Sequence, residues 1–225
     1  TPAASFNSDM FVEHVHHAQR LMDDIIDLEL EKIDLILQKI QKDPEESEIK
    51  RTEINLWQNI KQKALQGRRT GIGITAEGDM LAALGIQYGS DNGIQFCEEV
   101  HKTIAVETYR ASVKLGRERG PFPIYNLENE KNNPFINRLF QEDPELEQEM
   151  KRWGRRNISL LTVAPTGSVS ICTQTTSGIE PVFLISYTRR KKVNPNDQNT
   201  VVTFVDDSGD SWEEYSVFHH KFVTW

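Results

Sequence analysis

The segment from Ala164 to Cys172, with the sequence APTGSVSIC, is the strongest candidate for a chemical role. It follows a continuous apolar run of strand length. A strand that ends in small, hydroxylic and glycine residues exposes consecutive backbone N–H groups beside hydroxyl groups. Amide dipoles and hydroxyls both donate to anionic oxygens, so the turn is suited to phosphate. A helix that begins near Val169 would add its positive end to the field.

A purely structural interpretation explains the same residues. In that case the segment is an ordinary strand-to-helix turn, with Thr166 or Ser168 as the N-cap of the next helix. The spacing alone leaves both interpretations open. The turn has no lysine at the Walker A position, so it does not indicate a P-loop nucleoside triphosphatase.

Four other groups of residues indicate chemistry less specifically. Gly71-Ile72-Gly73 is half of a dinucleotide fingerprint, and a buried strand whose glycines admit another backbone explains it better. The histidines lack a third ligand at metal-site spacing, so we expect solvated side chains at all of them (His14, His16, His17, His219 and His220). The acidic patch has no ExxH companion and predicts a solvated stripe (Asp23, Asp24, Asp27, Glu29 and Glu31). Asp206–Asp210 lacks the later glutamate of a calcium loop and predicts a hairpin tip.

The two cysteines, Cys97 and Cys172, have no CxxC or CxxH companion. They therefore give neither a zinc pattern nor a disulfide framework, and we expect two reduced, mostly buried thiols. Cys172 follows the candidate phosphate turn closely. We still interpret it as a packing thiol, because a junction between a strand and a helix favours small buried residues.

The composition is that of a globular protein. Of the 225 residues, 37% are hydrophobic and 27% are charged, which argues against wholesale disorder. The net charge of −8 excludes a protein built to coat nucleic acid. No run approaches the roughly 20 apolar residues of a membrane span, and no signal peptide opens the chain, so we expect a cytoplasmic location. The start without Met and the end on Trp225 suggest an excised piece of a longer protein.

Apolar periodicity predicts an α/β architecture that is rich in helices. The expected helices run from Ser8-Asp9 to about Ile40, from about Ile49 to Gly67, from Glu77 to Leu84, from Ser90-Asp91 to Leu115, and after the pairs Asn133-Pro134 and Asp143-Pro144. Strands are predicted at 69–75 and 158–164, the second covered on both faces. The segment from Val182 onward predicts a β-hairpin.

Several of these segments together resemble the large subunit of ribonucleotide reductases. Their order and separation are similar to the C-terminal half of that family's catalytic barrel: RRTGIGIT at 68–75, GRRNI at 154–158, APTGSVS at 164–170 and SGIEP at 177–181. AQRLMDDII at 18–26 and ETYRASVKL at 107–115, the latter running into RGPFP at 119–123, are similar to two of its helices. The Pro-Thr-Gly-Ser turn, Glu77–Met80 and the basic hairpin resemble the adenosylcobalamin-dependent class, class II.

The resemblance implies a partial ten-stranded α/β barrel. Residues 1–66 would be a helical segment, 67–186 the barrel strands and helices with the phosphate turn, and 187–225 a β-hairpin excursion. Carried over position by position, backbone N–H and hydroxyl groups at five positions would bind the substrate phosphates (Thr166, Gly167, Ser168, Val169 and Ser170). Glu180 and Pro181 lie in a family motif and receive no chemical role.

The implied activity is reduction of a ribonucleotide at its 2′ carbon by a thiyl radical. Homolysis of adenosylcobalamin would generate that radical, and the protein would supply position and electrostatics. The implied partners are the ribonucleotide substrate, nucleotide effectors and an external thiol reductant such as thioredoxin. We expect neither nucleic acid nor membrane as a partner, and no metal site.

The chain also departs from the family pattern. The family's radical cysteine lies in an Asn-x-Cys-x-Glu loop, which this sequence lacks, and neither Cys97 nor Cys172 matches a catalytic position. We therefore expect the piece alone to be inactive, with no catalytic residue of its own. Two alternatives stay open: a stand-alone anion- or nucleotide-binding module, and a helical interaction scaffold in which the turn is only a cap.

Overall fold

The computed structural model describes residues 4–197 and 199–224, and it divides into two compact units. The first, here called the helical unit, comprises Phe6–Gly73 and Ile94–Ala164. The second, here called the turn unit, comprises Ile74–Gly93 and the described part of Pro165–Trp225, together with Ala4 and Ser5.

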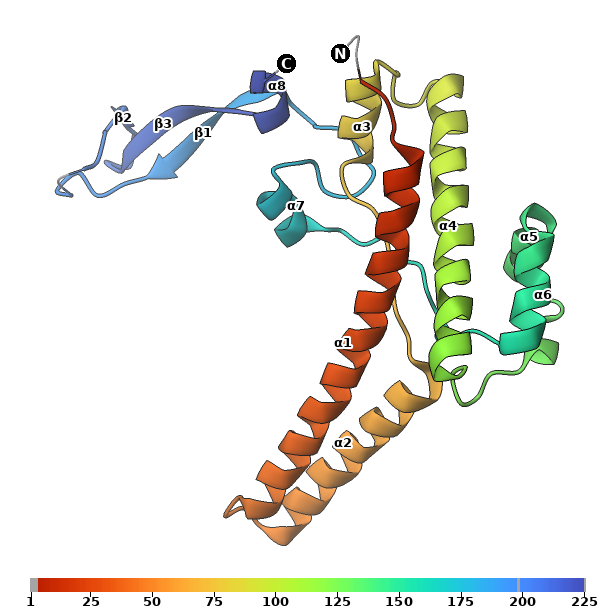
Figure 1. Cartoon of the computed structure of the whole chain (residues 1–225). Coiled ribbons are helices and arrows are strands. Elements are labelled where there is room, and N and C mark those ends of the chain that lie inside the picture. The colour runs from red at the N-terminus through yellow and green to blue at the C-terminus, as the bar shows by residue number, and fades with distance from the viewer. Residues whose placement is uncertain (1–3, 198, 225) are drawn as a thin grey trace. The chain divides into compact units, whose positions relative to one another are not determined.

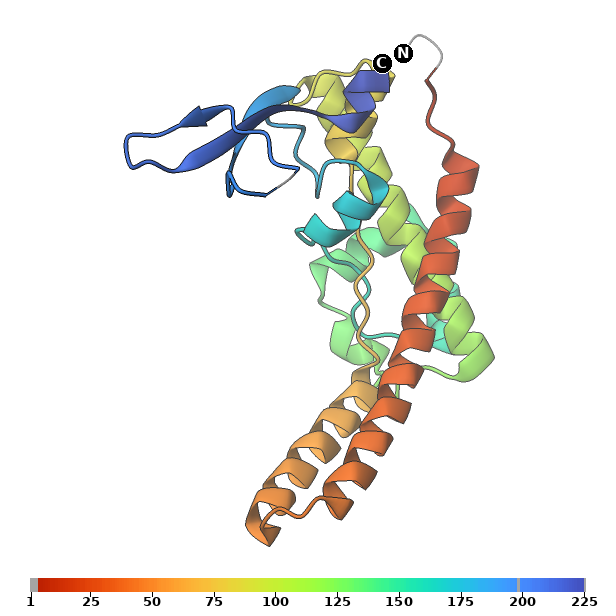
Figure 2. The same ribbon diagram turned by 90° about the vertical axis from the view of Figure 1, so that its left-hand side faces the viewer.

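Two long helices form an antiparallel hairpin in the helical unit (Figure 1 and Figure 2). They are α1, Ser8–Lys42, and α2, Ser47–Gly67. Helix α1 begins where the Asn7 side chain accepts a hydrogen bond from the Met10 N–H at 3.0 Å, so the cap lies one residue before the expected Ser8-Asp9 pair. The helix ends before Pro44, because proline disfavours a helical residue in front of it.

The core of the helical unit lies between α4 and two short helices. Helix α4 is Asp91–Arg119, α5 is Pro134–Glu142 and α6 is Pro144–Trp153, with a 3-10 turn η1 at Leu127–Glu130. Proline opens α5 and α6, as predicted, and the structure adds Asn133 and Asp143 as their capping side chains. The buried residues packed together there come from α4, α5, α6 and the segment after α6 (Ala105, Tyr109, Val113, Ile136, Leu139, Leu146, Met150 and Leu160).

The two predicted strands of the barrel pair with each other, but neither is a regular strand. An isolated parallel bridge joins Ile72 to Leu161. Hydrogen bonds run from the Thr70 N–H to the Ser159 carbonyl at 2.9 Å and from the Ile72 N–H to the Leu160 carbonyl at 2.8 Å. The prediction of two strands at 69–75 and 158–164 was therefore wrong in their regularity, because this pair has no further strand beside it within the described residues and lacks the hydrogen bonds that keep a strand regular. The extended, parallel course was predicted correctly.

Glycines permit this pairing. A Cβ atom at Gly73 would lie 2.3 Å from the backbone oxygen of Thr162, and a Cβ atom at Gly71 would lie 3.0 Å from the Thr162 side chain. The two backbones therefore approach to a distance that only glycine allows. This confirms the interpretation of Gly71-Ile72-Gly73 as a close-packed extended segment.

The turn unit contains three short helices and a small sheet. Helix α3 is Glu77–Leu84, α7 is Gly167–Thr173 and α8 is His220–Thr224. Helix α3 has the predicted bounds and ends at Gly85, whose φ of 73° is the left-handed conformation that glycine adopts readily.

The sheet is antiparallel, with the order β1-β3-β2. Strand β1 is Ser186–Lys192, β2 is Phe204–Val205 and β3 is Ser211–Phe218. Strands β2 and β3 form the predicted hairpin. Asp206 at its tip accepts hydrogen bonds from the Ser208 and Asp210 N–H groups. The sequence did not predict that β1 pairs along seven residues on the other side of β3. This open sheet is the only one within the described residues, and they do not form a closed ten-stranded barrel.

Among the described residues, no helix combines the length and the apolar character needed to cross a lipid bilayer.

The close approach at Gly73 gives a stability prediction. Gly73→Ala should lower the free energy of unfolding by about 1–3 kcal/mol, because the new methyl group meets backbone that cannot rotate away. Urea denaturation followed by circular dichroism measures the change. Gly167→Ala is the control, because a Cβ atom there has nothing within 4 Å, and its stability should be nearly unchanged. Equal midpoints for the two variants would contradict the prediction.

Candidate functional site

The segment predicted to bind phosphate forms the exposed start of helix α7. Thr166 occupies the N-cap position and Gly167 is the first helical residue. Gly167, Ser168 and Val169 are exposed, and Thr166 and Ser170 are half-buried. The turn is therefore open to solvent and lies at the end of an element, not in its middle.

The backbone N–H groups of the turn divide into two sets. The Gly167 N–H donates to the Pro165 carbonyl and the Ser170 N–H donates to the Thr166 carbonyl, both at 2.8 Å. Within the described chain, the N–H groups of Ser168 and Val169 have no acceptor. They belong to the first turn of the helix, where N–H groups have no intrahelical partner. Two adjacent amides are thus available to an anion.

The hydroxyl groups of the turn also differ in whether their hydrogen is available to an anion. Thr166 Oγ1 accepts a hydrogen bond from the Gly178 N–H at 3.1 Å, which leaves its own hydrogen free to donate. Ser170 Oγ donates to the Gly167 carbonyl at 2.7 Å, so its hydrogen is used within the helix. Thr166 makes no side-chain capping bond to α7 in the described structure. The interaction that defines the capping interpretation is therefore absent at Thr166.

The start of helix α3 holds the loop that follows α7. Thr75 Oγ1 donates to the Thr176 carbonyl at 2.8 Å, and the Thr176 N–H donates to Asp79 Oδ2 at 3.0 Å. Further along the loop, a Cβ atom at Gly78 would lie 2.4 Å from the Cα of Pro181. Pro181 and the adjoining Glu180 backbone therefore pack directly on α3. The sequence signal for this contact is a glycine, Gly78, in the first turn of a helix.

A second polar cluster, here called the Asp23 cluster, lies in the helical unit. It consists of Asp23 on α1 and four residues that contact it: Arg68 after α2, Arg119 at the end of α4, and Arg156 and Asn157 after α6. Arg68 Nε donates to Asp23 Oδ1 at 2.8 Å, and Arg119 Nη1 donates to Oδ2 at 2.9 Å. Asn157 Nδ2 donates to Oδ1 at 3.0 Å. The Asp23 side chain is fully buried.

This cluster corrects the prediction of a solvated acidic stripe. Asp23 is buried, whereas Asp24 and Asp27 are about half exposed. The prediction failed at Asp23 because its partners are distant in sequence and cannot be seen from the helix alone. Burial by itself raises the pKa of the Asp23 carboxyl. Hydrogen bonds from Arg68 and Asn157 and the charges of Arg68 and Arg156 outweigh this, so its pKa lies below the usual value.

The three carboxylates of this region have oxygens within 4.8 Å of one another. That arrangement alone is not a metal site. Arg68 and Arg119 bridge the same oxygens by forming ion pairs with Asp23, Asp24 and Asp27. Their guanidinium groups already neutralise the charge that a cation would need.

Comparison with known proteins identifies the fold family. Residues 1–213 match the family model of the ribonucleotide reductase barrel domain. The chain belongs to this family.

Individual relatives agree with the barrel-domain match. The chain is 34% identical over 122 residues to the vitamin B12-dependent ribonucleoside-diphosphate reductase of Mycobacterium tuberculosis (strain ATCC 25618 / H37Rv), covering 54% of this chain and 15% of that protein. It is 32% identical over 133 residues to the enzyme of that name from Thermoplasma acidophilum, covering 59% and 15%. The ribonucleoside-diphosphate reductase subunit alpha of Helicobacter pylori (strain 26695) is 31% identical over 149 residues, covering 58% and 19%. The chain thus spans less than a fifth of the length of these relatives.

The motifs that resemble the reductase family lie in the Asp23 cluster and in the turn at Thr166–Ser170. Arg68 and Asn157, from the RRTGIGIT and GRRNI motifs, bind Asp23 of the AQRLMDDII helix. The SGIEP motif supplies Gly178, which contacts Thr166 of the APTGSVS motif. Motifs far apart in the sequence are thus joined by direct hydrogen bonds.

The prediction of solvated histidines is confirmed at His14, His17 and His220, which are exposed, whereas His16 and His219 are half-buried. His16 Nε2 lies 2.8 Å from Glu107 Oε2, and His14 Nδ1 lies 2.6 Å from the Met10 carbonyl. The side chain of His219 is 12% exposed and its Nε2 lies 3.6 Å from Asp79 Oδ1, so the prediction was wrong there. Only tertiary packing places a carboxylate next to His219.

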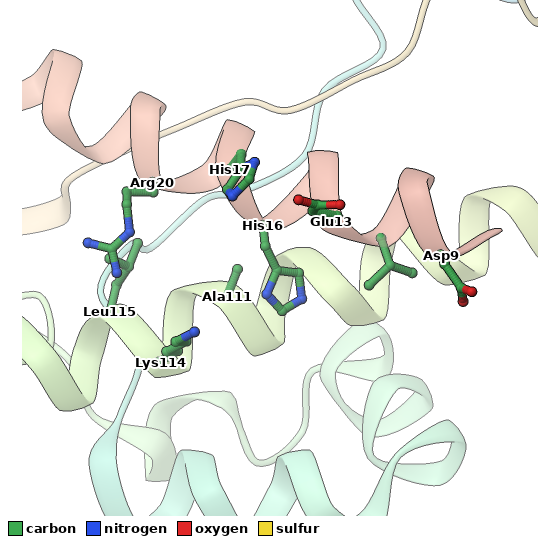
Figure 3. A pocket seen from close by; sticks show the side chains of 9 residues that line it. Asp9, Glu13, His16, His17, Arg20, Ala111, Lys114 and Leu115 are labelled. Carbon is green, nitrogen blue, oxygen red and sulfur yellow. The ribbon is translucent and has the colours of Figure 1, made fainter. Parts of the chain in front are cut away.

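A cavity of about 460 Å³ lies between α1 and α4, and Figure 3 shows its lining. Asp9, Glu13, His16, His17, Arg20 and Lys114 contribute side chains of both signs. Arg20 pairs with Glu118 and His16 pairs with Glu107. Because carboxylates and basic side chains alternate in its lining and Arg20 and His16 already have carboxylate partners, the cavity has no consistent preference for one kind of ligand.

The two cysteines also differ from the prediction of buried thiols. Cys97 on α4 is half-buried and Cys172 on α7 is exposed. The packing role assigned to Cys172 was therefore wrong. Helix α7 has only seven residues, and none of them is buried, so its outer face is open to solvent.

The Asp23 cluster predicts that the neighbouring carboxylates of Asp23 and Asp24 contribute very differently to the free energy of unfolding. Asp23→Ala should lower the free energy of unfolding by about 3–5 kcal/mol, because it removes the buried counter-charge of Arg68 and leaves this guanidinium only the half-exposed Asp27. Asp24→Ala is the matched control. Among the described residues, half-exposed Asp24 forms an ion pair with Arg119 alone, so this substitution should cost at most about 1 kcal/mol. Urea denaturation of both variants measures the two values, and similar losses would contradict the assignment.

The low pKa of Asp23 also predicts a pH dependence. Its folded-state pKa lies below its unfolded-state value, so ionised Asp23 stabilises the fold at neutral pH and this contribution is lost as pH falls through the folded-state pKa. The difference in unfolding free energy between wild type and Asp23→Asn should therefore shrink as pH falls below about 4. Denaturant titrations at a series of pH values test this. A constant difference would show that the Asp23 charge is not what stabilises the fold.

Proposed function

We propose that this chain is the part of a ribonucleotide reductase catalytic barrel that binds the substrate phosphates. The observation that supports the proposal most directly is the open turn at Thr166–Ser170. It offers the unpaired N–H groups of Ser168 and Val169, together with a Thr166 hydroxyl whose hydrogen is free. Membership of the barrel-domain family supports a ribonucleotide phosphate as the ligand of this turn.

The five proposed phosphate-binding residues contribute unequally. Ser168 and Val169 act through their amides and Thr166 through its hydroxyl. Gly167 acts by leaving room, because a Cβ atom there has nothing within 4 Å. Ser170 contributes least, since both its amide and its hydroxyl hydrogen are used inside the turn. A site of this kind stabilises a phosphate through dipoles and hydrogen bonds without a fixed cation.

In the complete protein, we propose, the parallel segments around Ile72 and Leu161 are adjacent strands of a ten-stranded barrel. The complete enzyme would reduce a ribonucleotide at its 2′ carbon by thiyl-radical chemistry. Two of the named relatives are vitamin B12-dependent, and all three named relatives are ribonucleoside-diphosphate reductases. These names support adenosylcobalamin as the source of the radical and a diphosphate as the substrate. Nucleotide effectors and a thiol reductant such as thioredoxin would be the other partners.

This chain's own residues do not supply the radical step. Cys97 is half-buried and Cys172 is exposed, and neither lies in an Asn-x-Cys-x-Glu sequence. We therefore assign the chain a substrate-binding role, and expect the 225 residues alone to be inactive. A stand-alone binding module or a helical scaffold is not favoured, because the barrel-domain match spans residues 1–213.

The complete enzyme with Gly167→Val tests the proposal. The free chain has room for the side chain, so the fold should persist while the substrate phosphate loses its space. We expect the dissociation constant for cytidine diphosphate to rise at least tenfold, the effect of losing roughly one charge-assisted hydrogen bond. Isothermal titration calorimetry measures it.

Cys172→Ser provides the matched control on the same helix. It is exposed, and it lies outside the first turn. Its affinity for cytidine diphosphate should equal that of the wild type. An unchanged affinity in Gly167→Val, with thermal melting showing an intact fold, would remove the site assignment.

A further inference from the structure

The loop after helix α7 is held by helix α3 through groups that the proposed phosphate site does not include. We propose that Asp79 is a positioning residue that orients the Thr166 hydroxyl for substrate phosphate by fixing the loop from Thr176 to Gly178. This inference rests on the proposed function of the turn, which it deepens.

The first step is the fixation of Thr176. The buried carboxylate of Asp79 accepts the Thr176 N–H at 3.0 Å, and Thr75 Oγ1 donates to the Thr176 carbonyl at 2.8 Å. Both backbone polar groups of one loop residue are thus bound by residues four positions apart at the start of α3. The Thr176 hydroxyl is buried and has no partner within the described chain. Thr176 is therefore held through its backbone and not through its side chain.

The second step leads from Thr176 to the turn. Two residues further on, the Gly178 N–H donates to Thr166 Oγ1 at 3.1 Å, and the Gly178 carbonyl accepts the Glu77 N–H at 3.5 Å. The N–H of Gly178 occupies one lone pair of the Thr166 hydroxyl. The hydroxyl hydrogen must then point away from Gly178, and it is free to meet an anionic oxygen. If the loop from Thr176 to Gly178 moved, the Gly178 N–H would no longer fix the direction of the Thr166 hydroxyl hydrogen.

The surroundings of Asp79 agree with a role directed at the loop. Asp79 lies in the first turn of α3, but its hydrogen bond reaches out to Thr176. Its other carboxylate oxygen lies 3.6 Å from His219 Nε2. The carboxylate therefore links three segments of the turn unit: α3, the loop after α7 and the start of α8. A residue in this position fixes geometry without touching the substrate.

The test compares substitutions in the complete enzyme, with cytidine diphosphate as substrate. Asp79→Ala should raise KM roughly tenfold and leave kcat nearly unchanged, because it weakens phosphate binding rather than the chemical step. Asp79→Asn keeps an oxygen that can accept the Thr176 N–H and should restore much of the affinity. Asp207→Ala, which removes an exposed carboxylate at the hairpin tip, should match the wild type.

Thr75→Val keeps the test decisive if Asp79→Ala does not fold. It removes the donor to the Thr176 carbonyl with little change in shape, and should raise KM in the same direction. A wild-type KM in folded Asp79→Ala or in Thr75→Val would overturn the inference. If Gly167→Val still weakens binding in that case, the proposed function stands and only the positioning role fails. If Gly167→Val also binds normally, both fail.

Discussion

The buried carboxylate of Asp23 is the constraint on which the helical unit depends. A charge removed from water needs opposite charges and donors around it, and here these come from three other segments of the chain. Arg68 follows α2, Arg119 ends α4, and Asn157 follows α6. Because Asn157 is next to the extended segment that pairs with Ile72, the same cluster fixes where the parallel pair begins. Apolar packing alone would leave this register loosely defined.

The turn unit relies on backbone groups where the helical unit relies on charges. The free donors at Ser168 and Val169 exist because the first turn of any helix leaves them unpaired. Whether an anion can reach them depends on what surrounds them. In the described structure these surroundings are an open space beside Gly167, a Thr166 side chain that makes no capping bond to α7, and a loop hydrogen-bonded to α3. The proposed anion-binding surface is thus built from neutral groups, which is compatible with the net charge of −8.

Local signals in the sequence predicted the local structure well. Prolines after Asn133 and Asp143 gave the starts of α5 and α6, and glycines gave the ends of α2 and α3, because caps depend on neighbouring residues. The failures concern burial. Asp23, His219 and Cys172 were misjudged because solvent exposure is decided by segments distant in sequence. The prediction of regular strands at 69–75 and 158–164 failed for a related reason, because a strand is kept regular by hydrogen bonds to neighbouring strands. The turn itself was located by composition, yet the role of α3 in supporting it was not.

The hydrogen bonds of Asn157 have a consequence for which residue types its position can accept. Its amide nitrogen donates to Asp23 and to the Arg68 carbonyl, while its amide oxygen accepts from Gln19 and Ser112. A carboxylate of the same size would lose both donors and bring a second negative charge to Asp23. An apolar side chain would remove one hydrogen-bond partner from each of four polar groups in the interior. The surroundings of Asn157 require a side chain with two donors and an acceptor, and not merely one of the right volume. A primary amide is the functional group that meets this requirement.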